Sequence, residues 1–182
     1  MKITILNGNP NKQDTDFENH LSLLGETLQK EHNANIIRLR ELSIQYCVGC
    51  FGCWVKKPGE CLFPDGSTAV RRAVIQCDLL IFASPILMGF TSAVLKQATD
   101  KLIPLIHPYM VIDQGEVHHR KRYEAYPLLG LLLQPEADTD QEDLQIITHS
   151  YERLAINFKT KLAFMRLITD PVKEVVHEIN RL

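Results

Sequence analysis

Four of the five cysteines lie close together in the sequence, as Cys47, Cys50, Cys53 and Cys61. Their spacing is C-x2-C-x2-C-x7-C, and each two-residue interval lets neighbouring thiolates reach the same metal centre. Four thiolates are the usual protein ligands of a cubane iron–sulfur cluster. Structural zinc sites also use four sulfurs, but usually as two C-x2-C pairs with a longer spacer. The spacing therefore favours a cluster over zinc, and unligated thiols or a reversible disulfide are the alternative.

Composition indicates an ordinary globular protein. The 182 residues are 45% hydrophobic and 23% charged, with a formal net charge of −2, so we expect a single domain over residues 1–182 and no nucleic-acid partner. The apolar runs are too short to span a bilayer, and strand-like residues at the start leave no room for a signal peptide. We therefore expect a cytoplasmic protein without a membrane partner, in which cysteines serve metal or redox chemistry. Cys77 is expected to be a buried, unreactive thiol.

Strand-like and helix-like runs alternate along the chain. The sequence predicts strands at residues 2–7, 35–40, 79–83, 128–133 and 161–168. It predicts helices over residues 67–76 and 92–102 and around residues 144–158. Two more helices are predicted from their start signals: one at a capping box of Thr15 and Glu18, and one at Pro171 with Asp170 as the cap. Two segments interrupt the alternation: a cysteine-rich loop at residues 45–66 and a poorly periodic surface excursion at residues 103–124.

Such an alternation predicts an α/β fold with a parallel sheet covered by helices on both faces. Ligands of these folds bind beyond the carboxyl ends of the strands, where the strand order reverses. We therefore expect the loops after the first, third and fourth strands to meet at one crevice; these are residues 8–15, 84–91 and 134–140. The cysteine-rich loop follows the second strand, so we also expect it near this crevice.

Three segments together resemble a known family. They are the turn Asn7-Gly8-Asn9-Pro10, the cysteine run with Trp54 and Pro58-Gly59-Glu60-Cys61, and Ser84-Pro85 followed by Ser92-Ala93-Val94-Leu95-Lys96. They are similar to those of flavodoxin-like NAD(P)H-dependent FMN reductases, and most of all to the iron–sulfur flavoprotein branch. The resemblance implies a flavodoxin-like three-layer sandwich with five parallel strands in the order 2-1-3-4-5. It also implies bound FMN, NAD(P)H as a possible electron donor, and a homodimer or homotetramer.

The resemblance also implies which residues bind the cofactors. The four cysteines would hold a 4Fe–4S cluster, and the flavin-binding residues would be Asn9, Asn11, Thr15, Ser84, Pro85, Ile86, Leu87, Met88 and Gly89. No catalytic side chain is expected, because the isoalloxazine carries the redox chemistry itself.

Three departures from the family pattern bear on FMN binding. Asp14 and Asp16 flank the expected phosphate site. Repulsion between a carboxylate and a phosphate charge about 6 Å apart would weaken FMN binding by about 2–3 kcal/mol per charge pair, at an effective dielectric of about 20. The alternative role of the two aspartates is to stabilise the start of a helix. Met88 and Phe90 stand where relatives often have an aromatic residue against the flavin, and residues 134–140 form an acidic loop.

Two hypotheses follow. The first is an FMN-dependent oxidoreductase that passes electrons between FMN and a 4Fe–4S cluster, with a redox partner protein or a small molecule as acceptor. The alternative is a degenerate flavodoxin-like module without FMN, which acts in protein interaction or binds zinc through the cysteine loop.

Overall fold

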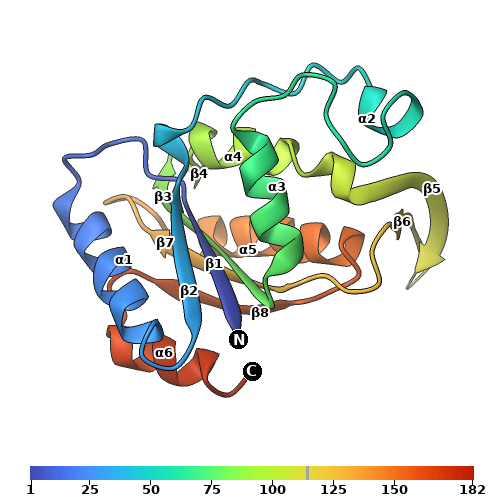
Figure 1. The fold of residues 1–182 in the computed structure, drawn as a ribbon. Helices are drawn as coiled ribbons and strands as arrows, with labels where there is room; N and C mark the ends of the chain where they lie inside the picture. The colour runs from blue at the N-terminus through green and yellow to red at the C-terminus, as the bar shows by residue number, and fades with distance from the viewer. Residues whose placement is uncertain (114) are drawn as a thin grey trace.

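A parallel sheet forms the centre of the molecule, as predicted (Figure 1). The computed structural model describes residues 1–113 and 115–182. Within them, five parallel strands run in the order β2-β1-β3-β7-β8, which confirms the predicted order 2-1-3-4-5. Their bounds are β1 Lys2–Asn7, β2 Asn33–Arg38, β3 Leu79–Leu87, β7 Leu128–Gln134 and β8 Leu162–Leu167. A two-residue strand, β4 (Phe90–Thr91), pairs antiparallel with the end of β3.

The central strands read as continuous apolar runs because both of their faces are buried. In β3, Leu80 and Phe82 point into one hydrophobic core, whereas Leu79, Ile81 and Ala83 point into the other. This alternation is the two-residue period of a strand. Gly130 in β7 permits close packing, because a Cβ there would lie 2.4 Å from the ring of Phe164 on β8.

Helices cover both faces of the sheet (Figure 1). One core includes side chains of α1 (Thr15–Leu28) and α6 (Val172–Ile179). The other includes side chains of α3 (Ser67–Gln76), α4 (Ala93–Asp100) and α5 (Gln141–Asn157). Among residues 1–113 and 115–182, no helix has the length and apolar character needed to cross a bilayer.

Three predicted boundaries were wrong. Thr15 is the first residue of α1 and not its cap; the cap is Asp14, whose side chain accepts a hydrogen bond from the Phe17 N–H. Asp170 does not cap α6 either, because its carboxylate accepts from the Leu167 N–H at the end of β8. The second strand starts and ends two residues early, since its predicted last residues enter a 3₁₀ turn, η1 (Leu39–Glu41).

The excursion at residues 103–124 contains a β-hairpin that the sequence pattern did not reveal. A 3₁₀ turn, η2 (Ile103–Leu105), leads into β5 (Ile106–Asp113), which pairs antiparallel with β6 (Glu116–Lys121). The strand register shifts between Ile106 and Met110, so the alternation is broken where Pro108 removes a backbone donor. The hairpin projects from the main sheet on the side of α2 (Gly52–Val55), as Figure 1 shows.

Candidate functional site

The loops after β1 and β3 are joined by buried hydrogen bonds at the carboxyl edge of the sheet. The Gly8 N–H donates to the Ala83 carbonyl (2.8 Å), and the Ser92 hydroxyl donates to the Gly8 carbonyl (2.5 Å). The Ser92 N–H in turn donates to the Ser84 hydroxyl oxygen (2.9 Å). Only glycine fits at position 8, because a Cβ there would lie 2.6 Å from Cβ of Leu95. These contacts hold the loops after β1 and β3 in a fixed arrangement at the predicted crevice.

A chain of asparagine side chains shapes the loop after β1. The N–H of Asn9 donates to Oδ1 of Asn7 (2.9 Å), that of Asn11 to Oδ1 of Asn9 (2.9 Å), and that of Gln13 to Oδ1 of Asn11 (3.0 Å). Asn9, a predicted flavin ligand, is only 1% exposed, and its side chain bonds to the backbone of the loop at Asn11. The Asn11 side chain is exposed. These side chains already occupy three backbone N–H groups that a phosphate could otherwise use.

An ion pair lies beneath the same loop. Glu18 receives two hydrogen bonds from the Arg40 guanidinium, at 2.7 and 3.1 Å, and further ones from the side-chain amides of Asn7 and Asn9. Burial acts to raise the pKa of Glu18, but the bonds from Arg40, Asn7 and Asn9 outweigh it and lower that pKa. Arg40 also donates to the Asn9 carbonyl (3.2 Å), so the pair fixes the loop to η1.

We expect the Arg40→Met variant to lose about 2 kcal/mol of unfolding free energy, because Glu18 would remain largely buried without its counter-charge. Urea denaturation measures this loss. The matched control is Arg38→Met, because Arg38 lies 3.7 Å from Glu18 with a side chain that is 42% exposed. Its expected loss is below about 0.5 kcal/mol. Equal losses in the two variants would show that the Glu18–Arg40 pair has no special role.

The start of α1 contacts the end of β7 at the predicted crevice. Oδ1 of Asp14 accepts from the Phe17 N–H (3.3 Å) and from Nε2 of Gln134 (3.4 Å). Oε1 of Gln134 is buried and, within the described residues, has no hydrogen-bond partner. Thr15 is exposed at the first turn, where backbone N–H groups have no acceptor inside the helix. The crevice thus combines an unpaired acceptor with donors at a helix N-terminus.

The predicted residues after β3 divide into two groups. Ser84, Pro85 and Ile86 are buried within β3, which extends beyond the predicted strand end at residue 83. Leu87 is 43% exposed and Met88 98% exposed at the tip of the β3–β4 hairpin. Met88 (φ 55°) and Gly89 (φ 77°) form its two-residue turn in the left-handed region. A non-glycine residue held there is strained, and such strain often marks a functional position.

These groups fit an FMN molecule. The first turn of α1 offers N–H donors to a phosphate, the Gln134 Oε1 can accept from a hydroxyl or a ring N–H, and Leu87 and Met88 offer apolar contact. Sequence reasoning missed Gln134 and Glu136 as individual site residues, although both lie in the acidic loop after β7. Glu136 accepts from the Gly89 N–H (3.3 Å) and thereby closes the loop after β7 onto the hairpin tip.

The four clustered cysteines line one small cavity, which we call the sulfur cavity. Its volume is about 30 Å³, and its apolar walls include Val48, Phe51, Leu62, Phe63, Ile103 and Pro104. Cys47 and Cys50 are exposed, Cys61 is half-buried and Cys53 is buried. Burial raises the pKa of Cys53, and the other three thiols act in the same direction. In the described residues, no three His, Cys, Asp or Glu side chains have the geometry of a metal site.

Local backbone features bring the thiols to this cavity. Gly49 has a positive φ of 63°, and Phe51, with φ of 52°, precedes the short helix α2. A Cβ at Gly52 would lie 2.2 Å from Cδ1 of Leu62 and 3.5 Å from Sγ of Cys50. Glycine at position 52 therefore permits the close approach of the two segments that carry the cysteines. The donor set of four thiols around one cavity fits an iron–sulfur cluster chemically.

Trp54 fixes the cysteine loop to the β5–β6 hairpin. Its indole N–H donates to the Ile106 carbonyl (3.0 Å), and its ring stacks on Phe51 at 5.3 Å and contacts the His119 ring at 5.1 Å. Trp54 therefore anchors the cysteine loop on the hairpin and not on the edge of the main sheet. The excursion at residues 103–124 thus supports the candidate metal site.

A buried ion pair of Lys101 and Asp65 lies beside Cys61 of the cysteine-rich loop. Lys101 is 3% exposed, and its ammonium lies 3.2 Å from Oδ2 of Asp65 and 3.6 Å from Sγ of Cys61. Asp65 also accepts from the backbone N–H groups of Gln45 and Ser67, both at 2.9 Å. One carboxylate therefore ties together the beginning and the end of the cysteine loop.

The sulfur cavity and the crevice lie at opposite ends of α4. Ser92, at the crevice, caps the start of this eight-residue helix, whereas Lys101 and Ile103, beside the sulfurs, follow its end. A helix of this length spans about 12 Å. The cysteine loop begins at the expected edge of the sheet, after β2, but it continues along the length of α4 (Figure 1). The expectation that its sulfurs lie near the crevice was therefore wrong.

Cys77 is separate from the other thiols, as predicted. It is 8% exposed at the end of α3, directly before β3, and its thiol donates to the Val74 carbonyl. Burial raises the pKa of Cys77 to about 11, so the thiol stays protonated at neutral pH.

Comparisons with known proteins agree with this fold and these segments. An iron–sulfur flavoprotein of Archaeoglobus fulgidus is 30% identical over 102 residues, covering 56% of this chain and 48% of that protein. One of Methanocaldococcus jannaschii is 26% identical over 105 residues, covering 58% of this chain and 53% of that protein. The chain thus spans about half the length of the curated relatives it matches.

A solved structure supports the fold, and a family model identifies the family. The NAD(P)H:quinone oxidoreductase from Methanothermobacter marburgensis superposes with a TM-score of 0.62 at 16% identity, covering 100% of this chain and 94% of that one. At this identity the likeness confirms the flavodoxin-like fold alone. The family model of the NADPH-dependent FMN reductases matches residues 1–121, well over half of the 182 residues. The chain therefore belongs to the NADPH-dependent FMN reductase family.

Proposed function

We propose that this chain acts as an FMN-dependent NAD(P)H oxidoreductase that passes electrons between FMN and a 4Fe–4S cluster. The observation that carries the proposal is the arrangement of four thiols around one cavity in a member of an FMN reductase family. Curated relatives that match this chain are named iron–sulfur flavoproteins, which supports the same combination of cofactors.

The crevice residues would bind and orient the flavin. Backbone N–H groups of the α1 first turn around Thr15 would receive the phosphate, and the exposed Asn11 side-chain amide would donate to it. The Gln134 Oε1 would accept from the ribityl chain or the ring, and Leu87 and Met88 would cover the ring. FMN, when bound, supplies hydride and single-electron chemistry, so the protein needs no acid or base of its own. A nicotinamide donor would approach from the side of the hairpin tip, where Met88 and Gly89 are exposed.

The sulfur cavity would hold the cluster through Cys47, Cys50, Cys53 and Cys61. The 30 Å³ cavity must widen to admit a cubane, and the exposed Cys47 and Cys50 lie on the segment that has room to move outward. The Lys101 ammonium beside Sγ of Cys61 would stabilise the thiolate, and the Phe51 and Trp54 rings would limit access of water.

The proposal extends to partners and location. The acceptor would be a redox partner protein or a small molecule. A homodimer or homotetramer would form through the β5–β6 hairpin, which exposes Tyr109, Met110, Ile112 and Val117. We place the protein in the reducing cytoplasm, where the clustered thiols would stay available as ligands. With a net charge of −2, nucleic acid is not a fitting partner.

A single anaerobic preparation tests the proposal. The purified chain would be reconstituted with iron, sulfide and FMN, then analysed for iron, sulfide, zinc and flavin, and its visible spectrum recorded. We expect one flavin and close to four irons and four sulfides per chain, as a cubane contains. If the chain fails to quench FMN fluorescence, the flavin part of the proposal is wrong.

A second candidate function is a module without FMN that binds zinc or a protein. Two observations favour it: Asp14 already accepts from an N–H of the α1 first turn, and Glu136 accepts from the Gly89 N–H. Both carboxylates would oppose the anionic phosphate and the flavin carbonyls. Zinc without iron, sulfide or flavin in the same preparation would establish this alternative.

A further inference from the structure

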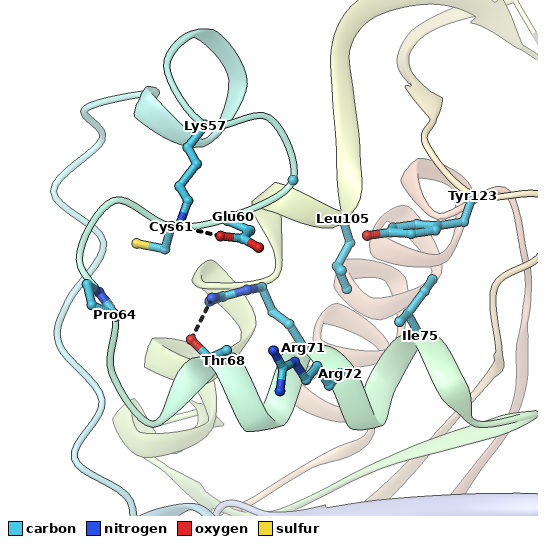
Figure 2. A pocket seen from close by; sticks show the side chains of 11 residues that line it. Lys57, Glu60, Cys61, Pro64, Thr68, Arg71, Arg72, Ile75, Leu105 and Tyr123 are labelled. Atoms are coloured by element: carbon cyan, nitrogen blue, oxygen red, sulfur yellow. Dashed lines mark hydrogen bonds and ion pairs between the residues drawn. The ribbon is translucent and has the colours of Figure 1, made fainter.

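A second cavity, which we call the basic pocket, lies beside Cys61 and outside the crevice. Its volume is about 260 Å³, and it lies between α3 and the segment that carries Lys57 and Cys61 (Figure 2). Leu105 of η2 and Tyr123, which follows β6, complete its wall. The Figure 2 view places both arginines of α3 below the Glu60–Cys61 segment.

Positive charge dominates the lining of this pocket. Lys57, Arg71 and Arg72 face one carboxylate, Glu60, which pairs with Lys57 at 2.5 Å. In the part of the chain described, neither arginine has a carboxylate within 4.0 Å of its charged nitrogens. The Arg122 guanidinium adds to this charge, because its Nη1 would lie 4.0 Å from a Cβ built on Gly59, a lining residue.

Arg71 is the most informative of these residues because it is only 6% exposed. Its guanidinium donates to neutral oxygens alone: the Ser67 hydroxyl (2.6 Å), the Lys101 carbonyl (3.5 Å) and the Thr68 hydroxyl (3.0 Å). These bonds hold the group in place without neutralising it, and they use three of the five N–H donors of a guanidinium. The Ser67 hydroxyl also donates to Asp65, but that carboxylate already pairs with the Lys101 ammonium, so two buried cations share it. A buried cation with so little counter-charge is costly unless an anion binds to it.

The opposite end of the basic pocket is apolar. Ile75, Leu105 and Tyr123 line it, and the Tyr123 ring lies along the wall in Figure 2. The pocket therefore has a cationic end for an oxyanion and an apolar end for a hydrocarbon or aromatic body. A guanidinium fork with a nearby hydroxyl, Thr68, matches the several oxygens of a phosphate.

We propose that the basic pocket binds a small organic phosphate, a phosphate monoester with an apolar body. Its phosphate would lie between Arg71 and Arg72, and its body would contact Ile75, Leu105 and Tyr123. The bound molecule would lie beside Cys61, at the far end of α4 from the crevice, so this site is distinct from the proposed FMN site. Binding here requires neither flavin nor iron, so the inference goes beyond the proposed function.

Isothermal titration of the purified, metal-free chain with phenyl phosphate tests this inference. Inorganic phosphate, benzoate and phenol are titrated as comparisons. We expect phenyl phosphate to bind at least about tenfold more tightly than inorganic phosphate or phenol. Inorganic phosphate lacks the apolar body, and phenol lacks the phosphate. Tighter binding of benzoate would reassign the site to carboxylates and overturn the phosphate proposal. No measurable binding at about 1 mM phenyl phosphate would also overturn it.

Matched variants locate the binding. Arg72 is exposed, so Arg72→Ala should fold normally and weaken phenyl phosphate binding about tenfold, the usual value of one charged hydrogen bond. The control is Arg181→Gln, which removes an exposed charge beside α6 and should leave the affinity unchanged. An equal loss in both variants would mean non-specific attraction and contradict the proposal.

Alkylation of thiols gives an independent measurement that needs no variant. Phenyl phosphate should slow the reaction of iodoacetamide with Cys61, which lines the basic pocket, and leave that of the exposed Cys47 unchanged. Mass spectrometry reads both positions in one sample. Equal rates at Cys61 with and without phenyl phosphate would place any binding elsewhere.

Discussion

The Cys50→Ala variant, reconstituted anaerobically, should retain at least about tenfold less iron than the Cys77→Ala variant. Cys50 is one of four thiols that line the sulfur cavity, so its loss leaves an incomplete centre that air removes. Cys77 lies at the end of α3, away from that cavity, and its thiol donates to the Val74 carbonyl. Iron and sulfide analysis before and after exposure to air measures the difference.

Folding must be checked before this comparison is interpreted. Cys50 is exposed and contributes nothing to either hydrophobic core, so the circular dichroism of Cys50→Ala should match that of the wild type. Cys77 is part of a core, so Cys77→Ala should be slightly less stable yet keep its iron. Full iron content in both variants, or iron in neither variant nor wild type, would contradict cluster binding by this loop.

Local patterns in the sequence predicted the sheet well. The apolar runs that became β1, β3 and β7 are buried on both faces, so their hydrophobicity alone identified them. The alternation of strands and helices predicted that the sheet is parallel, whereas the order of its strands was implied by the family resemblance. The C-x2-C-x2-C spacing also predicted that three thiols lie near one another, because such short intervals leave the chain little freedom.

The missed features depend on contacts between residues far apart in the sequence. Glu18 appeared to belong to a capping box with Thr15, but Arg40, 22 residues away, binds its carboxylate. Trp54 meets the Ile106 carbonyl across 52 residues, and this contact brings the hairpin against the cysteine loop. Gln134 gave no signal beyond its place after a strand, since an unpaired acceptor becomes visible only in three dimensions.

The Asp65→Ala variant should lose about 3 kcal/mol of unfolding free energy, because it leaves the buried Lys101 ammonium without a counter-charge. It also removes the acceptor of the Gln45 and Ser67 N–H groups, which join the two ends of the cysteine loop. Urea denaturation measures the loss. In the double variant Asp65→Ala/Lys101→Met, part of the stability should return, because the lone buried charge is gone. A loss in the double variant equal to the sum of the two single losses would contradict this coupling.

Acid should reproduce the effect of Asp65→Ala in the wild type. Burial acts to raise the pKa of Asp65, but hydrogen bonds from Ser67 and Gln45, together with Lys101, outweigh it and lower the pKa from 3.8 to about 2. The folded state therefore binds this proton more weakly than the unfolded chain does. The stabilisation, about 2 kcal/mol, is complete above pH 3.8 and is lost as the pH falls towards 2. The unfolding free energies of wild type and Asp65→Ala should therefore differ most near neutral pH, and the difference should shrink by about 2 kcal/mol as the pH falls towards 2. A constant difference across this range would contradict the assignment of a lowered pKa to Asp65.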